Sequence, residues 1–186
     1  EKLNIEMQDF LAPMAGRLPS NRSDIYFKEL GSESPILVKL IMQSIYQSDK
    51  RRIKHIGAEQ FGMKFLLRGL YAHNGLFYFY TRLDNDTNMP FDVDFVTFKV
   101  VDKKVAKRTA MQERVLQPLR SFHQMMQVWP DSHEQTVFAL EQFSLSEDKE
   151  LQVTLYERGG GRTLSFSLDQ EGLLLAQKID KLKLKW

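Results

Sequence analysis

From residue 63 onward, apolar and polar residues alternate with a period of two in a succession of short segments. Successive side chains of a strand point to opposite faces of a sheet, so this pattern predicts strands with one buried face. Turn residues separate the clearest segments, which are 63–71, 76–83, 96–100, 136–140, 151–155 and 164–168. Short strands at this spacing are typical of antiparallel sheets and favour a mainly β chain.

Two connections carry hairpin signals. Asn74-Gly75 stands between the first two segments, and an Asn-Gly pair suits the two-residue turns that join antiparallel strands. Gly159, Gly160 and Gly161 stand before the last segment, and glycine adopts positive φ without a steric cost. We expect Gly159, Gly160, Gly161 and Arg162 to form a structural turn. A phosphate loop is excluded there, because the Lys-Ser/Thr pair that it requires is absent.

One helix is expected before the strands, over residues 34–57. Ser34 can cap it, Pro35 suits its first turn, and Gly57 suits the position just after its end. An apolar stripe recurs at helical spacing and predicts packing on the sheet; it consists of Leu37, Ile41, Ile45, Ile53 and Ile56. Basic residues at 50–55 would occupy the last turns, either as a solvated match to the helix dipole or as a patch for nucleic acid or an acidic partner.

The expected fold is an antiparallel, immunoglobulin-like β-sandwich of about seven strands, preceded by one α-helix and an extended N-terminal arm. A partly open barrel is the alternative. The chain has no cysteine, so "immunoglobulin-like" refers to architecture alone. The expected organisation is an arm or linker over 1–33, a helix over 34–57, and a sandwich with a C-terminal tail over 58–186. Pattern leaves open whether the tail begins as helix or strand.

Composition and motifs predict no enzyme, no cofactor and no metal site. Without cysteine there is no disulfide, thiolate metal site or cysteine nucleophile. The histidines lack metal-ligand spacing and are expected on the surface or in turns; they are His55, His73, His123 and His133. A net charge of only +2 makes direct binding of nucleic acid an unfavoured reading. We expect any export signal to lie upstream of the sequence in hand.

The stretch DKKVAKRTAMQE, residues 102–113, concentrates basic residues. As a strand it would have no apolar face, so it is expected at an edge, in a bulge or in an exposed connection. Its lysines either deter pairing with other sheets or bind a partner, for which its mixture of a forked donor, a hydroxyl and acceptors is suited. The candidate partner-binding residues are Lys103, Lys104, Lys107, Arg108, Thr109, Gln112 and Glu113. Arg108 is expected to be anchored by a carboxylate such as Glu113 or Asp94.

Several motifs resemble one protein family. They are LFYFYTRL at 76–83, Asn85, FDVD at 91–94, Phe98, DKK at 102–104, KRTA-x-QE at 107–113, and ERGGGR at 157–162 followed by Leu164 and Phe166. With this set, over roughly residues 36–168, the chain resembles the TraN family of conjugative-transposon proteins of Bacteroides and relatives. The resemblance implies an envelope component of a conjugation apparatus, similar in role to outer-membrane core subunits of type IV secretion systems, and implies no enzyme.

Two functional hypotheses therefore stand. The first is a non-enzymatic structural subunit of the transfer apparatus, periplasmic or associated with the outer membrane, that docks on other subunits or on itself and has no small-molecule substrate. In it, at least one terminus packs along a sheet, and residues 103–108 contact an acidic partner. The second is a ligand-binding or adhesin-like sandwich that holds a glycan or surface polymer on the aromatic loop around Trp129.

Overall fold

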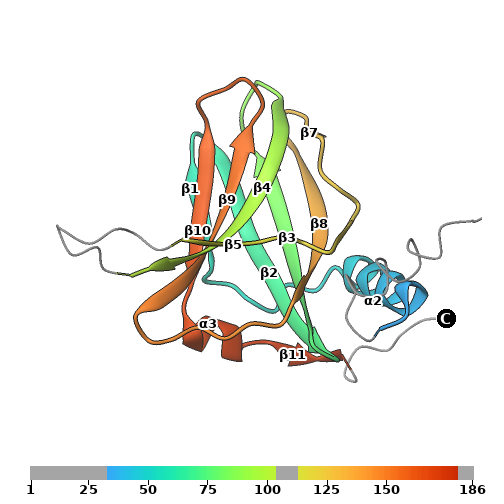
Figure 1. The fold of residues 1–186 in the computed structure, drawn as a ribbon. Helices are drawn as coiled ribbons and strands as arrows, with labels where there is room; N and C mark the ends of the chain where they lie inside the picture. The colour runs from blue at the N-terminus through green and yellow to red at the C-terminus, as the bar shows by residue number, and fades with distance from the viewer. Residues whose placement is uncertain (1–32, 104–112, 180–186) are drawn as a thin grey trace, which may run out of the picture.

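Two β-sheets lie face to face in a computed structural model, which describes residues 33–103 and 113–179 (Figure 1). In the first sheet the strand order is β1-β2-β3-β8-β6, with β11 also pairing with β2; in the second the order is β10-β9-β4-β5, with β7 also pairing with β4. The strands are β1 (Gly57–Gln60), β2 (Met63–His73), β3 (Leu76–Asn85), β4 (Phe91–Asp102), β5 (Arg114–Leu116), β6 (Arg120–Phe122), β7 (Gln127–Val128), β8 (Ser132–Glu141), β9 (Lys149–Glu157), β10 (Thr163–Leu168) and β11 (Gln177–Lys178).

The mainly β, antiparallel sandwich with one early helix that the sequence predicts is confirmed, but its strands are more numerous than expected. The described residues contain eleven strands rather than about seven. The additional four are β1, β6, β7 and β11, each with four residues or fewer. So few residues cannot display alternation, and the strands exist because neighbouring backbone groups pair with them. The pair of β11 with β2 is parallel.

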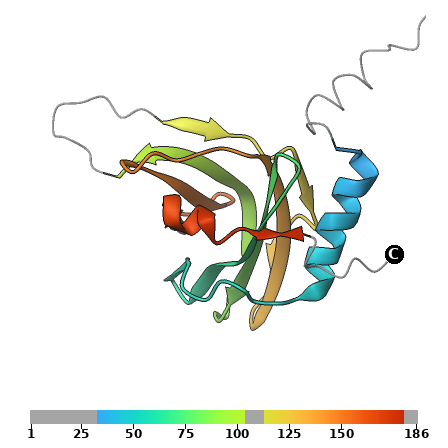
Figure 2. The same ribbon diagram turned by 90° about the horizontal axis from the view of Figure 1, so that it is seen from below.

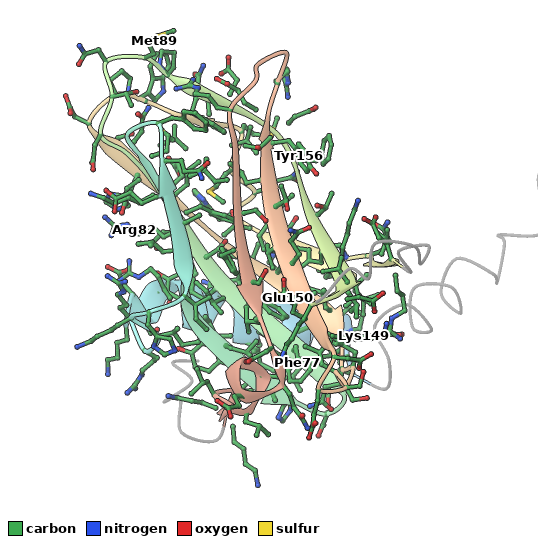
Figure 3. The ribbon with its side chains drawn as sticks, turned by 90° about the vertical axis from the view of Figure 1, so that its left-hand side faces the viewer. Phe77, Arg82, Met89, Lys149, Glu150 and Tyr156 are labelled. Carbon is green, nitrogen blue, oxygen red and sulfur yellow. The ribbon has the colours of Figure 1, made fainter. Side chains whose placement is uncertain are left out.

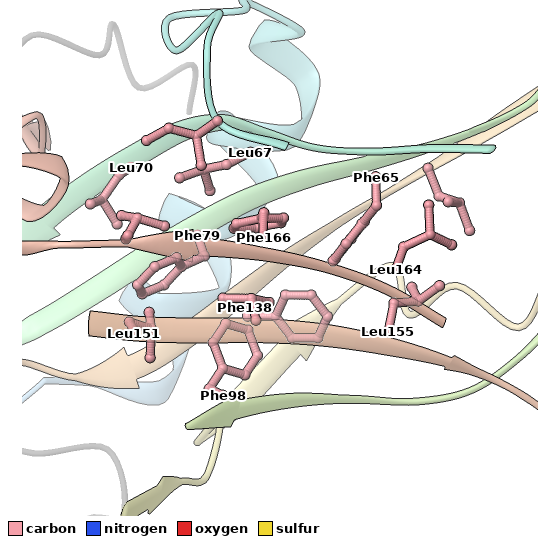
Figure 4. Packing of buried hydrophobic residues seen from close by; sticks show 14 of the residues in the cluster. Phe65, Leu67, Leu70, Phe79, Phe98, Phe138, Leu151, Leu155, Leu164 and Phe166 are labelled. Atoms are coloured by element: carbon pink, nitrogen blue, oxygen red, sulfur yellow. The ribbon is translucent and has the colours of Figure 1, made fainter. Parts of the chain in front are cut away.

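Large aromatic and aliphatic side chains from the inner faces of both sheets form the main core (Figure 4). Phe98 of the second sheet lies edge-on against Phe79 and Phe138 of the first, with ring centroids 5.5 and 5.3 Å apart. Phe98 is fully buried. Burial of such side chains is the main stabilising contribution to the sandwich.

A second core lies on the outer face of the first sheet, beneath helix α2 (Pro35–Ser48). Figure 2 shows α2 against one side of the sandwich. Its buried residues pack on three tyrosines of β2 and β3, namely Tyr71, Tyr78 and Tyr80. The middle of the first sheet is therefore buried on both faces, whereas no helix covers the outer face of the second sheet in the described part of the chain.

Helix α2 ends earlier than its apolar pattern suggests, so the expected extent of 34–57 is wrong. Asp49 adopts a left-handed conformation directly after Ser48, and its N–H donates to the Tyr46 carbonyl. Ile53 and Ile56 are buried, but in the core between the sheets rather than on the helix. Gly57 opens β1 instead of capping the helix, and Ser34, although at the N-cap position, makes no side-chain capping bond.

The basic residues at 50–55 consequently belong to the connection between α2 and β1 and not to the last helical turn, which holds no basic residue. This connection is tied down through its backbone, because the N–H groups of Arg52 and Ile53 both donate to the Arg68 carbonyl, at 2.7 and 3.0 Å. The prediction of dipole-matched cations at the helix end is therefore wrong.

Both predicted hairpins are present. Asn74 and Gly75 have φ values of 41° and 77°, the signs that a type I′ turn between β2 and β3 requires. Gly159, with φ of 61°, lies in the turn between β9 and β10. The part of the C-terminal tail that is described forms a short helix, α3 (Gln170–Leu174), and then β11. Neither described helix is long and apolar enough to cross a membrane.

Candidate protein-docking edge

Strand β4 carries the edge at which the predicted basic stretch begins. One side of β4 pairs with β9, and part of the other side pairs with β5 through Phe98, Lys99 and Val100. Because β4 and β5 are antiparallel neighbours, the residues between them join two strands at the border of the second sheet. The two described ends of the basic stretch, Lys103 and Glu113, therefore lie next to this border. Lys104, Lys107, Arg108, Thr109 and Gln112 lie outside the described residues.

The two ends of that connection are held by ion pairs. Lys149 Nζ lies 2.6 Å from an Asp102 carboxylate oxygen, and Lys99 Nζ lies 3.0 Å from Glu113 Oε2. These hydrogen bonds raise the pKa of Lys149 and of Lys99 above the usual lysine value. The described partner of Glu113 is therefore a β4 lysine, and anchoring of Arg108 by a carboxylate stays a prediction.

Lys103 lines an open pocket of about 600 Å³ next to α3. Its Nζ lies 3.7 Å from Asp169 Oδ2, and its backbone N–H donates to the Asp148 carbonyl. A hydrogen bond from the Gly172 N–H, together with the Lys103 charge, lowers the pKa of Asp169. Acidic and basic side chains line the pocket, namely Lys103, Glu150, Asp169 and Glu171, together with His55. Groups of both charge signs therefore line this pocket.

The glycine turn between β9 and β10 is fixed by Arg162. Its guanidinium forms a forked pair with the Glu157 carboxylate, donates to the Pro90 carbonyl at 3.0 Å, and lies over the Phe91 ring at 5.0 Å. The hydrogen bond from Arg162 holds the pKa of Glu157 below its usual range. A Cβ on Gly160 would overlap the Glu157 side chain, so glycine permits this approach. The contacts of Arg162 join the turn to the start of β4.

Replacement of Arg162 by lysine should lower the free energy of unfolding by about 1–2 kcal/mol, because lysine keeps the charge but loses the fork and the ring contact. Urea denaturation measures the difference. Arg158→Lys is the matched control, since Arg158 belongs to the same turn and its structural contact is a backbone N–H bond to Asp92. Equal losses in the two variants would contradict a specific role for Arg162.

The outer face of the second sheet and one end of the sandwich expose aromatic groups. Phe95 of β4 and Tyr156 of β9 stack with ring centroids 4.6 Å apart, and 48% of Phe95 is exposed. Trp129 is 61% exposed, in the predicted aromatic loop. The exposed Met89 lies at the end of the sandwich away from Phe77 and Lys149 (Figure 3). Alternation did not identify Phe95 as accessible, because it does not tell which sheet face remains uncovered.

The described residues contain no group of three or more His, Asp or Glu side chains placed to hold a metal ion. His123 instead lies beside the Tyr46 ring, with centroids 4.8 Å apart, and His73 lies 3.8 Å from Glu33. His123 thus contacts an aromatic side chain, and His73 lies near a carboxylate.

One protein-family model, described as "Domain of unknown function (DUF4138)", matches residues 35–178. The matched range runs from the first residue of α2 to the last residue of β11. Both sheets and the helix beneath which the tyrosines lie are thus part of the family's common domain. A search of curated proteins finds no match.

Proposed function

We propose, from the premise that this chain belongs to the DUF4138 family, that its domain is a non-enzymatic protein-docking module. In this proposal it is a TraN-type structural subunit of a conjugative-transfer apparatus in the cell envelope, in the periplasm or at the outer membrane. The motifs at 76–83, 107–113 and 157–162 support the finer assignment, because together they resemble that family. The partners are other subunits of the apparatus.

The observation that carries the docking role is the position of the basic stretch. It joins β4 to β5 at the border of a sheet, and its first cation, Lys103, lines a charged pocket. Protection of the sheet edge against pairing with other sheets explains the lysines less well. β5 has only three residues, and so short an edge strand already limits such pairing. Contact with an acidic partner is therefore the better explanation for the basic residues at 103–108, which precede this short strand.

Reversing two charges tests this role. The variant Lys104→Glu with Lys107→Glu should lower partner capture by ~10-fold or more, because electrostatic complementarity across the interface is lost. Capture is measured as the proteins retained by the tagged, full chain from an envelope fraction and identified by mass spectrometry. For the unaltered protein, raising the salt concentration from about 50 to about 300 mM should weaken capture, because salt screens exposed ion pairs.

The matched control is Lys50→Glu with Lys54→Glu, which reverses the same number of charges in the exposed connection after α2. This control should retain capture. If both double variants bind as the unaltered chain does, or if both lose binding equally, the stretch is not the docking site.

A saccharide-binding function is the second candidate, and the exposure of Trp129 favours it. An exposed aromatic ring can stack on the apolar face of a sugar, and the Phe95–Tyr156 stack offers another such surface. Trp129→Ala should then abolish retention on an immobilised polysaccharide while leaving the far-ultraviolet circular dichroism unchanged. Retention that does not depend on Trp129 would count against this candidate.

A further inference from the structure

The edge of β4 that faces away from β9 is open in its middle. At one end Phe91 and Asp92 pair with β7, and the Val93 N–H donates to the Met126 carbonyl. At the other end Phe98, Lys99 and Val100 pair with β5. Among the described residues no strand pairs with residues 94–97 on this side. We call residues 94–97 the β4 opening.

The opening arises because the neighbouring strand is interrupted. β5 and β7 both run antiparallel to β4, as two pieces of one edge strand would. Between them, residues 117–126 leave the second sheet and contribute β6 to the first sheet, where it pairs with β8. Backbone groups at the middle of such an edge are available to an added strand.

Side chains at the opening are also less covered than their neighbours. Val96 points to the core side but is only partly buried, whereas Val93 and Phe98, on the same side of β4, are 4% and 0% exposed. On the outer side, Phe95 is 48% and Val115 is 50% exposed. An added strand with alternating apolar residues would cover Val96 with its apolar face, and its backbone would satisfy the edge of β4.

We propose that residues 181–186 of a second copy of this chain add as a strand at the β4 opening. This segment reads Lys-Leu-Lys-Leu-Lys-Trp. In a strand its leucines and tryptophan would share one face and could cover Val96, while its lysines would share the other. Asp94 is exposed at the opening and has no ion pair among the described residues, so the lysines have a carboxylate to approach.

The charge of the added segment and the length of the chain favour the tail of a second copy over residues 3–7 and over the chain's own tail. The other alternating segment, residues 3–7, has Glu6 between its apolar residues and would bring a negative charge to Asp94. The chain's own tail is too short. Ile179 packs on the outer face of the first sheet, and residues 180–186 span at most about 23 Å, of which pairing along four residues takes about 13 Å. The tail would have to pass from the outer face of the first sheet to β4 in the second sheet. The two sheets are about 10 Å apart, and the path around the edge of the first sheet adds to this, so the remaining ~10 Å of chain is too short.

The donor and acceptor surfaces differ, so the association is heterologous and yields rings or chains of copies rather than isolated two-fold dimers. This inference rests on the proposed docking function in that it names another copy as one partner. It places the contact at residues 94–97, however, and the contact with a different, acidic partner stays at the basic stretch.

Cysteine cross-linking tests the contact directly, since the chain has no cysteine of its own. A full chain with Thr97→Cys is mixed with a differently tagged full chain carrying Lys181→Cys, Lys183→Cys or Lys185→Cys and oxidised gently. We expect a disulfide between the two tags for at least one lysine position, because paired strand residues bring their Cβ atoms to about 4.5–5.5 Å. The control Ser165→Cys, on the exposed face of β10, should give no such product.

Analytical ultracentrifugation supplies a second measurement. Leu182→Ser with Leu184→Ser should lower the association constant of the full chain by ~10-fold or more, with an unchanged melting temperature at a concentration where the unaltered chain is monomeric. The inference is wrong if no tail position gives a cross-link to Thr97→Cys. It is also wrong if a chain that carries both Thr97→Cys and a tail cysteine forms the disulfide only within itself, or if Asn4→Cys in the N-terminal segment cross-links to Thr97→Cys more strongly than the tail does. If cross-linking fails while capture still depends on Lys104 and Lys107, this inference fails and the proposed function stands.

Discussion

Phe98→Ala should lower the free energy of unfolding by about 3–5 kcal/mol, the usual cost of removing a large aromatic side chain from a core. Phe98 is fully buried and contacts Phe79 and Phe138 across the two sheets. Its loss leaves a cavity at the centre of the sandwich that the surrounding rings can fill only in part. Since a domain of this kind has a total stability of only about 5–15 kcal/mol, the variant should lose a large share of its stability.

Urea denaturation followed by tryptophan fluorescence measures this loss. Phe95→Ala is the matched control, because Phe95 lies on the same strand, three residues earlier, but is 48% exposed on the outer face. Its cost should stay within about 1 kcal/mol. Equal costs for the two variants would mean that the two sheets do not pack through Phe98.

Asp49→Ala should have the second largest effect, about 1–3 kcal/mol, because it removes the common acceptor of several buried donors, while solvent screens the Asp49 side chain, which is 61% exposed. Asp49 Oδ1 accepts from the Tyr80 hydroxyl and from Gln135 Nε2, both at 2.9 Å, and lies 2.8 Å from Arg68 Nη1. Arg68 also donates to the Asp49 carbonyl at 3.0 Å. Without this carboxylate, the end of α2 loses its side-chain bonds to the sheet, and the buried Arg68 keeps only the Asp49 backbone carbonyl and the Tyr80 ring as described partners.

The matched control for this variant is Asp86→Ala, which removes an exposed carboxylate 2.6 Å from Lys64. An exposed pair of this kind contributes about 0–1 kcal/mol. Thermal and urea unfolding of both variants give the comparison. A loss for Asp49→Ala no greater than that for Asp86→Ala would show that the network under α2 does not stabilise the fold.

The same network predicts a dependence on pH. Burial would raise the pKa of Asp49, but the hydrogen bonds from Gln135 and Tyr80 and the charge of Arg68 outweigh it and lower the pKa. A carboxyl whose pKa is lowered by folding adds stability above its unfolded value, near 3.9, and this stability disappears as pH falls through the folded pKa. Asp49→Asn should flatten the loss of stability below about pH 4. Glu157 contributes in the same direction and should leave a remainder.

Local chemistry made some of the fold predictable. The Asn74-Gly75 turn needs only its own two residues to adopt positive φ, and the expected hairpin forms there. The extent of α2 was not predictable in this way. Ile53 and Ile56 continue the helical spacing of Ile41 and Ile45, but they are buried in the core between the sheets and not beneath the helix. Only the tertiary structure shows which of the two cores each isoleucine joins.

The basic stretch at 102–113 could be recognised from the sequence, but the contacts of its described ends could not. The lack of an apolar face at 102–113 predicts an exposed stretch; its described ends adjoin the antiparallel neighbours β4 and β5, and its middle lies outside the described residues. Pairing of Glu113 with Lys99 depends on strand register, which composition does not carry. The β4 opening depends on β6 crossing to the other sheet, a property of topology alone. The Arg162–Glu157 pair, by contrast, could have been inferred from opposite charges on either side of a glycine turn.

The parallel pair of β11 with β2 constrains the order in which the polypeptide can fold during synthesis. Gln177 pairs with Tyr71 and Lys178 with Ala72, and Ile179 joins the cluster beneath α2. The outer layer of the first sheet therefore cannot be completed until about a hundred further residues have left the ribosome, which at typical rates takes several seconds. During that interval Tyr71 and Tyr78 have an incomplete cover, so the nascent domain presents an apolar surface that chaperones of the cell can bind.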